Sequence, residues 1–279
     1  MNQQVQVAYL GPRGTFSQEA AINRFGSNCT LYECYSIDEV FLAVEKNKVS
    51  YGLVPVENST EGAVNNTQDC LIESTSNIVG EVILPVVHCL LASPNVSVSA
   101  IEKIVSHKQS LAQCRNWIQK NYPAVQLIEC SSNAQAAKLA TESPDMAAIA
   151  GALAAKEYGL EVMQQGIQDR QHNSTRFLVL ANQSTSSSGK DKTSILVYTE
   201  NKPGALFRVL EPFENLQISL TKIETRPAKI EAWAYVFFID FEGHVQDETI
   251  VALFKRLKSC SAEIKVLGSY PTFELEAGK

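Results

Sequence analysis

The stretch AWAYVFFIDF, residues 232–241, carries a large apolar side chain at every second position: Trp233, Tyr235, Phe237, Ile239 and Phe241. Alternate residues of an extended chain point to the same face, so this stretch predicts a β-strand with one face packed against a core. Because the partner strands and helices of such a strand lie on either side of it in the sequence, the fold can be worked out from here in both directions.

Segments with apolar residues at helical spacing lie on both sides of this strand. The spacing predicts one helix that starts near Pro203 and a second helix over Asp247–Leu257. The first has its apolar stripe at Leu206, Val209, Leu210 and Phe213, and the second at Ile250, Leu253, Phe254 and Leu257. Further strands are expected at residues 193–199, 218–223 and 264–268. The resulting βαββαβ order is that of a ferredoxin-like sandwich.

A polar, serine-rich stretch, NQSTSSSGKDK at residues 182–192, precedes this part and has the composition of a linker. We therefore expect an N-terminal domain over residues 1–182, a linker over 183–192 and a C-terminal domain over 193–279.

The N-terminal domain alternates predicted strands and helices, which favours an α/β fold with mainly parallel sheets. Helices are expected at residues 17–25, where Ser17 is a candidate cap, and at 37–45, 110–120, 134–141 and 152–158. Strands are expected at 5–10, 31–35, 51–56, 104–106, 125–129, 147–150 and 176–180, and an apolar β-branched stretch spans 82–91. Periodicity alone does not decide between one large sheet and two lobes with a cleft.

Composition excludes several classes of function. The net charge is −6 and no dense Lys/Arg run occurs, which argues against a nucleic-acid binder. The longest apolar stretch, residues 82–92, is too short for a membrane helix, and no secretory signal is visible, so we expect a cytoplasmic protein. Seven cysteines without a CxxC pair and four scattered histidines give no metal-ligand spacing. We expect neither a metal nor a cofactor.

Four polar segments lie where predicted strands meet loops or helices: GPRGTFS at 11–17, VPVENSTEG at 54–62, SHKQSLAQC at 106–114 and DRQHNSTRF at 169–177. Polar groups at strand ends and helix N-termini suit anion binding, and an arginine suits a carboxylate. Each segment also has a purely structural interpretation as a turn, a helix cap or a solvated loop.

Five stretches, taken together and in this order, resemble the prephenate dehydratase family. They are YLGPRGTFSQEA at 9–20, GLVPVENSTEG at 52–62, SHKQSLAQC at 106–114, AAIAGALAAKEYGL at 147–160 and NSTRFLVL at 173–180. One departure is Lys108, which stands where the family usually has proline. The C-terminal part resembles an ACT domain, with Gly204-Ala205-Leu206 matching its GAL segment and Glu224-Thr225-Arg226-Pro227 its ESRP segment, with Thr in place of Ser.

The resemblance implies a two-lobed catalytic domain like that of periplasmic binding proteins, in a monofunctional enzyme. The family converts prephenate to phenylpyruvate with loss of water and carbon dioxide, on the way to phenylalanine. Thr175 matches the catalytic threonine of the TRF motif and would donate a hydrogen bond to the leaving hydroxyl. Arg176 would bind a substrate carboxylate, and Phe177 would pack beneath the ring or in the core. The other expected substrate contacts are Thr15, Ser17, Glu57, Asn58, Ser59, Ser106, Gln109, Gln113 and Asn173.

The ACT resemblance implies feedback inhibition by L-phenylalanine, bound between paired domains of a homodimer or homotetramer. Its expected contacts are Gly204, Ala205, Leu206, Glu224, Thr225, Arg226 and Pro227. A domain that only dimerises remains an alternative. Two rival functions also stay open: an arogenate dehydratase, which differs by an amino group on the substrate, and a noncatalytic sensor of small anions and amino acids.

Overall fold

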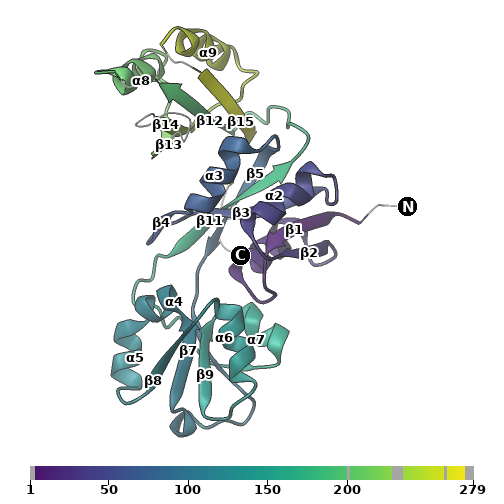
Figure 1. Ribbon diagram of the computed structural model, residues 1–279, viewed down its shortest axis with the longest axis vertical. Coiled ribbons are helices and arrows are strands. Elements are labelled where there is room, and N and C mark those ends of the chain that lie inside the picture. The colour runs from purple at the N-terminus through teal and green to yellow at the C-terminus, as the bar shows by residue number, and fades with distance from the viewer. Residues whose placement is uncertain (1–3, 200–201, 228–234, 261–262, 274–279) are drawn as a thin grey trace. The chain divides into compact units, whose positions relative to one another are not determined.

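The computed structural model describes residues 4–199, 202–227, 235–260 and 263–273. The chain divides into two compact units, Met1–Gln68 with Val82–Phe177, and Asp69–Glu81 with Leu178–Lys279. Three sheets organise these units (Figure 1). The expected α/β class with two lobes and a ferredoxin-like C-terminal domain is confirmed.

The first lobe is built on a sheet in the order β2-β1-β3-β11-β5, with β4 paired to β3. The central pairs β1/β2 and β1/β3 are parallel. Its strands are β1 (Gln6–Leu10), β2 (Thr30–Cys34), β3 (Tyr51–Asn58), β4 (Gly62–Ala63), β5 (Asn77–Pro85) and β11 (Ser174–Ala181). Its helices are α1 (Phe16–Phe25), α2 (Ile37–Glu45) and α3 (Asn65–Glu73).

The second lobe has a sheet in the order β10-β6-β9-β7-β8. Its strands are β6 (Cys89–Ala92), β7 (Lys103–His107), β8 (Gln126–Cys130), β9 (Met146–Ala150) and β10 (Glu161–Gln165). Its helices are α4 (Lys108–Gln113), α5 (Arg115–Asn121), α6 (Asn133–Ala140) and α7 (Ala152–Tyr158), with a short 3-10 turn at Val98–Ala100. Helices α4 and α5 cover one face of the sheet, and α6 and α7 cover the other (Figure 1).

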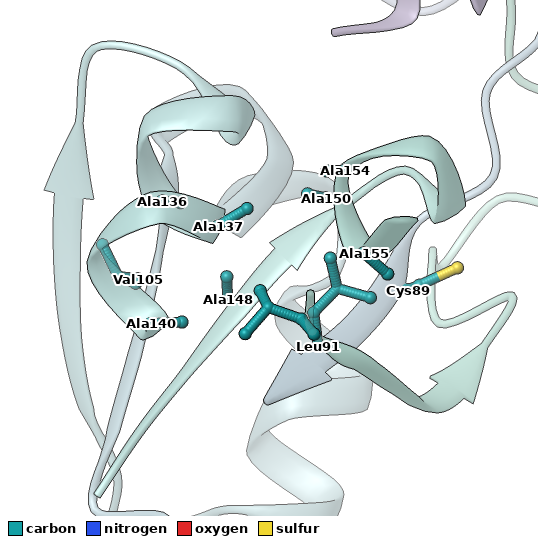
Figure 2. Close-up of a cluster of buried hydrophobic side chains, with 11 residues drawn as sticks. Cys89, Leu91, Val105, Ala136, Ala137, Ala140, Ala148, Ala150, Ala154 and Ala155 are labelled. Atoms are coloured by element: carbon teal, nitrogen blue, oxygen red, sulfur yellow. The ribbon is translucent and has the colours of Figure 1, made fainter. Parts of the chain in front are cut away.

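Alanine dominates the core beneath α6 and α7. Figure 2 shows Ala136, Ala137 and Ala140 of α6 facing Ala148 of β9, with Ala154 and Ala155 of α7 beside them. Single methyl groups let the helices approach the sheet closely, and this lobe therefore has little room for larger side chains at these positions.

The C-terminal domain has the sheet order β13-β14-β12-β15. Its elements are β12 (Asp191–Thr199), α8 (Ala205–Asn215), β13 (Leu220–Pro227), β14 (Tyr235–Glu242), α9 (Glu248–Cys260) and β15 (Glu263–Pro271). Phe237, Ile239 and Phe241 pack in one core with the buried stripes of α8 and α9, as their alternation predicts. Trp233 lies outside the described residues, and Tyr235 is 43% exposed.

The second unit also contains residues 69–81, which pack on the C-terminal domain. Lys265 Nζ donates to three carbonyl oxygens near the end of α3, those of Leu71 (3.1 Å), Ile72 (2.9 Å) and Ser74 (2.6 Å). Lys192 forms a 2.9 Å ion pair with Glu81. At Gly268 a Cβ atom would lie 2.1 Å from the backbone oxygen of Ile78, so only glycine allows this approach.

Several sequence-based element boundaries need correction. The cap of α1 is Thr15, whose Oγ1 accepts from the backbone N–H of Gln18, and Ser17 lies buried inside the helix. The helix expected at 110–120 is two helices that meet at Cys114. Strand β3 continues through Asn58, and β11 already includes Ser174 and Thr175, so both polar motifs lie partly within strands. Helix α3 and strand β10 were not expected.

Candidate active site

Thr175 and Asn58 meet where the neighbouring strands β11 and β3 carry polar residues. Asn58 Nδ2 donates a 2.9 Å hydrogen bond to Thr175 Oγ1. Asn58 Oδ1 accepts from the backbone N–H groups of Thr60 (2.9 Å) and Glu61 (3.1 Å), which fixes the orientation of the amide. Because the Thr175 oxygen accepts from Asn58, its own proton remains available for donation elsewhere.

The loop after β3 is fastened to the start of β11. Ser59 N–H donates to the carbonyl of Ser174 (2.9 Å), and Ser174 N–H donates to Ser59 Oγ (3.0 Å). The hydroxyls of Ser59 and Thr60 lie 3.4 Å and 3.3 Å from Oδ1 of the buried Asn173. The expected residues Asn58, Ser59 and Asn173 therefore form one hydrogen-bonded network beside Thr175.

Gln113, at the end of α4, joins this network from the second lobe. Its Oε1 accepts from Asn173 Nδ2 at 3.1 Å, and its Nε2 donates to Glu61 Oε1 at 3.3 Å. The same Oε1 lies 2.8 Å from Nε2 of His88, a buried histidine that is not among the site residues expected from the sequence. Burial lowers the pKa of His88, and the hydrogen bond with Gln113 opposes that shift, so the ring is neutral at physiological pH.

A cavity of about 730 Å³ opens in the first unit next to Thr175. Four of the expected substrate-site residues line it: Thr15, Ser17, Thr175 and Phe177. Phe177 is almost fully buried, and Arg176 points to the other face of β11 because strand residues alternate. The rest of the lining comes from Leu10, Gly11, Pro12, Phe16, Tyr35, Pro55, His107, Ser131, Ser132, Asn133, Gln135, Lys138 and Tyr158.

Two helix N-termini face this cavity, one from each lobe. Thr15, Phe16 and Ser17 form the start of α1, and Ser132 and Asn133 the start of α6. Helix N-termini carry partial positive charge, and Lys138 adds a full charge to the lining. The cavity is therefore suited to a small molecule with more than one anionic group.

Asn133 is held by an array of donors at the edge of the cavity. Its Oδ1 lies 2.9 Å from Ser110 Oγ and 3.1 Å from Ser106 Oγ, and accepts from His107 N–H at 3.3 Å. The Oγ of the fully buried Ser106 also lies 2.6 Å from the carbonyl oxygen of Ile149, so its single proton is shared between two acceptors. Ser106 thus orients Asn133 and lies outside the cavity lining.

The remaining expected contacts lie away from the lining. Gln109 is exposed on α4, and its N–H donates to the His107 ring at 3.4 Å. Glu57 and Arg176 are half-buried on β3 and β11. Lys108 is the first residue of α4, the position at which helices most readily accept proline, so the departure from the family motif leaves the helix start intact.

No described cysteine is poised for covalent chemistry in this region. Burial raises the pKa of Cys114 to about 12 and the pKa of Cys34 to about 11, so both thiols stay protonated at neutral pH.

The expected effector residues occupy two places in the C-terminal domain. Gly204, with φ of 75°, is the N-cap of α8 and precedes Ala205 and Leu206. Glu224, Thr225, Arg226 and Pro227 form the end of β13, the edge strand. Strand β14 separates β12, the strand that precedes α8, from β13, so the two strands associated with these motifs are not neighbours in the sheet of one chain.

Comparison with known proteins matches residues 7–185 to the family described as prephenate dehydratase and residues 193–259 to the ACT domain. The chain belongs to the prephenate dehydratase family. It is 49% identical to a bifunctional chorismate mutase/prephenate dehydratase of Stutzerimonas stutzeri, over 97% of this chain and 74% of the relative. It is 37% identical to a prephenate dehydratase of Lactococcus lactis, over 97% of this chain and 99% of the relative.

Solved structures of similar fold include a prephenate dehydratase from Arthrobacter aurescens in complex with L-Phe. It has a TM-score of 0.88 and 32% identity, and the match covers 96% of this chain and 90% of that chain. A protein described as a novel type of quorum-quenching acylase has the same TM-score of 0.88 at 26% identity, covering 96% and 98%. In the described part of this dehydratase-family chain, no helix is both long enough and apolar enough to span a membrane.

Proposed function

We propose that the protein is a carbon–oxygen lyase that converts prephenate to phenylpyruvate, water and carbon dioxide. The observation that carries this proposal is the hydrogen bond from Asn58 to Thr175 at the wall of the cavity. Because Thr175 Oγ1 accepts this hydrogen bond, its own proton is available for another acceptor. In prephenate that acceptor would be the ring hydroxyl, which is the group that must leave.

Thr175 would act by positioned donation rather than as a strong acid, because a threonine hydroxyl is a weak acid in water. As the ring carboxylate departs as carbon dioxide, its bonding electron pair completes the aromatic ring and the C–O bond breaks. The departing oxygen gains negative charge, which the Thr175 hydrogen bond stabilises, and it leaves as water after taking up a proton that solvent ultimately supplies.

The α1 and α6 N-termini and Lys138 would hold the two carboxylates of prephenate. Among the residues expected from the sequence, Thr15, Ser17 and Phe177 are proposed as direct contacts, since they line the cavity with Thr175. Glu57, Asn58, Ser59, Ser106, Gln109, Gln113, Asn173 and Arg176 remain proposed substrate-site residues. For Asn58 and Asn173 the contacts described above support a role that reaches substrate through Thr175 or the 58–61 loop.

We further propose that L-phenylalanine regulates the enzyme by binding the C-terminal domain at Gly204–Leu206 and Glu224–Pro227. The Arthrobacter prephenate dehydratase was solved in complex with L-Phe, and this chain carries an ACT domain after its dehydratase domain. Strand β13, which carries Glu224–Pro227, is an edge strand, so its outer side is open to a second copy of the domain, which supports the expected homodimer or homotetramer.

Two further expectations belong to this proposal. The domain division at residues 182 and 193 is supported by the family matches to 7–185 and 193–259. A cytoplasmic location is supported by the seven cysteines, all of which are free thiols, as is usual in a reducing compartment.

The test is to incubate the purified protein with prephenate, with and without phenylalanine, and to follow phenylpyruvate. Formation of phenylpyruvate that is suppressed by phenylalanine would support both the proposed activity and the proposed regulation. A higher kcat/KM for arogenate would favour the rival dehydratase, and prephenate binding without product would favour the sensor. Product formation that does not respond to phenylalanine would contradict the regulatory assignment alone.

A further inference from the structure

His88 occupies a fixed place on the connection between β5 and β6. Its backbone carbonyl accepts from the N–H groups of Gly166 (2.9 Å) and Ile167 (3.1 Å), and its own N–H donates to Gln168 Oε1 at 3.0 Å. Its ring meets Phe16 edge to face with centroids 5.7 Å apart. The backbone of His88 is therefore held by residues 166–168, which follow β10, and the imidazole is held in place by the ring of Phe16.

The hydrogen-bond partners define which ring nitrogen carries the proton. Gln113 Nε2 donates to Glu61, so Gln113 Oε1 is the atom that faces Asn173 and His88. That oxygen only accepts, and His88 Nε2 must therefore bear hydrogen and donate to it. Nδ1 is then an acceptor, and among the described residues this buried atom has no partner.

We propose that His88 is a positioning residue for the dehydration, which acts through Gln113 and Asn173 on the loop that carries Asn58. This inference rests on the proposed function, because the reaction is the event that the positioning serves. The chain of contacts runs from the His88 ring to Gln113 Oε1, and from the Asn173 amide to the hydroxyls of Ser59 and Thr60. Those residues directly follow Asn58, whose amide orients Thr175.

A packing role alone does not account for this histidine. Burial of an imidazole with an unpartnered Nδ1 costs free energy that an apolar side chain of similar size would not. The hydrogen bond from Nε2 compensates for this cost by fixing the side-chain amide of Gln113. Without that bond, Asn173 would be the one remaining donor to Gln113 Oε1 among the described residues, and the amide could rotate. A turned Gln113 would present its NH₂ group to Asn173 Nδ2 and break the network at its centre.

The decisive comparison is between His88→Gln and His88→Asn. The terminal amide nitrogen of glutamine reaches about as far as Nε2 of histidine, whereas that of asparagine stops near the place of Nδ1. We expect His88→Gln to keep kcat within about threefold and His88→Asn to lower it roughly tenfold, the effect of one lost buried hydrogen bond. KM should change little. The exposed His172 supplies the control, and His172→Asn should match the wild type.

A role in packing alone would change thermal stability and leave the kcat of the folded fraction unaltered. The expected loss is therefore measured at a temperature where every variant is folded. In a double-mutant cycle, His88→Asn combined with Gln113→Met should cost no more kcat than Gln113→Met alone. Equal kcat for His88→Asn and wild type, or equal losses for the Gln and Asn variants, would overturn the proposal.

The protonation state gives a readout that needs no substrate. In a long-range ¹H–¹⁵N spectrum of protein with ¹⁵N-labelled histidine, His88 should appear as the neutral Nε2–H tautomer, assigned by its loss in His88→Gln. An Nδ1–H tautomer would also overturn the proposal. If the wild type forms no phenylpyruvate, the proposed function fails, and the spectrum together with a stability cycle of the same variants still decides whether His88 holds Gln113.

Discussion

The guanidinium of Arg226 donates a 2.6 Å hydrogen bond to Oδ1 of Asp69, and so ties strand β13 to helix α3. Arg226 belongs to the segment proposed to bind the effector, and α3 follows the loop that begins at Asn58. Lys265 binds the last carbonyls of the same helix. Within the second compact unit, Arg226 thus contacts the middle of α3 and Lys265 its C-terminal end.

Asp69→Asn should weaken inhibition by phenylalanine while kcat without effector stays near the wild-type value. The variant loses the charge-assisted hydrogen bond between β13 and α3, so the binding of phenylalanine at β13 is coupled less strongly to α3. The concentration of phenylalanine that gives half inhibition should therefore rise about 5- to 30-fold. Glu73→Gln is the matched control, because Glu73 is exposed on the same helix. The measurement is the inhibition of wild type, Asp69→Asn and Glu73→Gln as a function of phenylalanine concentration. An unchanged curve for Asp69→Asn would show that the Arg226–Asp69 contact does not transmit the inhibition.

Thr175→Ala should lower kcat by about 10²- to 10⁴-fold, the usual worth of a positioned proton donor. Thr175→Ser keeps the hydroxyl and should retain most of the activity. Circular dichroism should show the same fold in both variants, since Thr175 is only half-buried. Near-normal turnover of Thr175→Ala would remove this residue from the chemistry.

The ion pair of Lys192 with Glu81 should matter more for stability than that of Lys103 with Asp145. Side-chain exposures are 12% and 1% for the first pair, and 33% and 30% for the second. Lys192→Met leaves a buried carboxylate without its cation and should cost about 3–5 kcal/mol, whereas Lys103→Met, at a solvent-screened pair, should cost far less. Urea unfolding followed by fluorescence measures both, and similar losses in the two variants would refute this ranking.

Asp191 should make the C-terminal domain less stable in acid. Burial alone would raise the pKa of Asp191, but hydrogen bonds from Ser188, Gly189 and Ser187 outweigh it and hold the pKa below its ordinary value. The Asp191 carboxylate therefore stabilises the folded state fully above the pKa that it has in the unfolded chain, near 4. This stabilisation is lost as the pH falls through the lower pKa that Asp191 has in the folded state.

The measurement is thermal unfolding of wild type and Asp191→Asn between about pH 7 and pH 2. The lowered pKa of Asp191 predicts that the melting temperatures of the two proteins converge at the acid end of this range. The variant should be less stable at neutral pH and should lose that disadvantage in acid. A difference in melting temperature that stays constant over this range would show that the carboxylate does not titrate as described.

The C-terminal fold was predictable because its information is local. Phe237, Ile239 and Phe241 alternate along one strand, and the stripes of α8 and α9 follow helical spacing, so the sequence shows which side of each element packs in the core beneath the helices. The opposite face of β14 is also buried, at Val236 and Phe238, which the alternation does not predict. Helix α3 was missed since its sequence, NNTQDCLIE, has a weak apolar pattern. Its last carbonyls are bound by Lys265, which lies far away in the sequence.

The candidate site was predictable as a set of motifs but not as a set of contacts. Thr175 and Asn58 are brought together by strand pairing, and the TRF and ENS motifs identified both. Lys138 and Asn133 belong to the cavity through the position of α6, which no short motif encodes. His88 gave a faint signal as the single polar side chain in residues 86–92, VVHCLLA, but its partner Gln113 is 25 positions away.

The close approach of Gly268 to Ile78 bears on how such enzymes can be recombined. A regulatory domain excised at residues 182–192 would take β15 away from the strand that it covers and leave Glu81 without Lys192. A donor domain with any side chain at the position of Gly268 would not seat on this β5. Chimaeras between relatives should therefore exchange residues 69–81 together with the C-terminal domain, because the compact unit extends beyond the ACT match at residues 193–259.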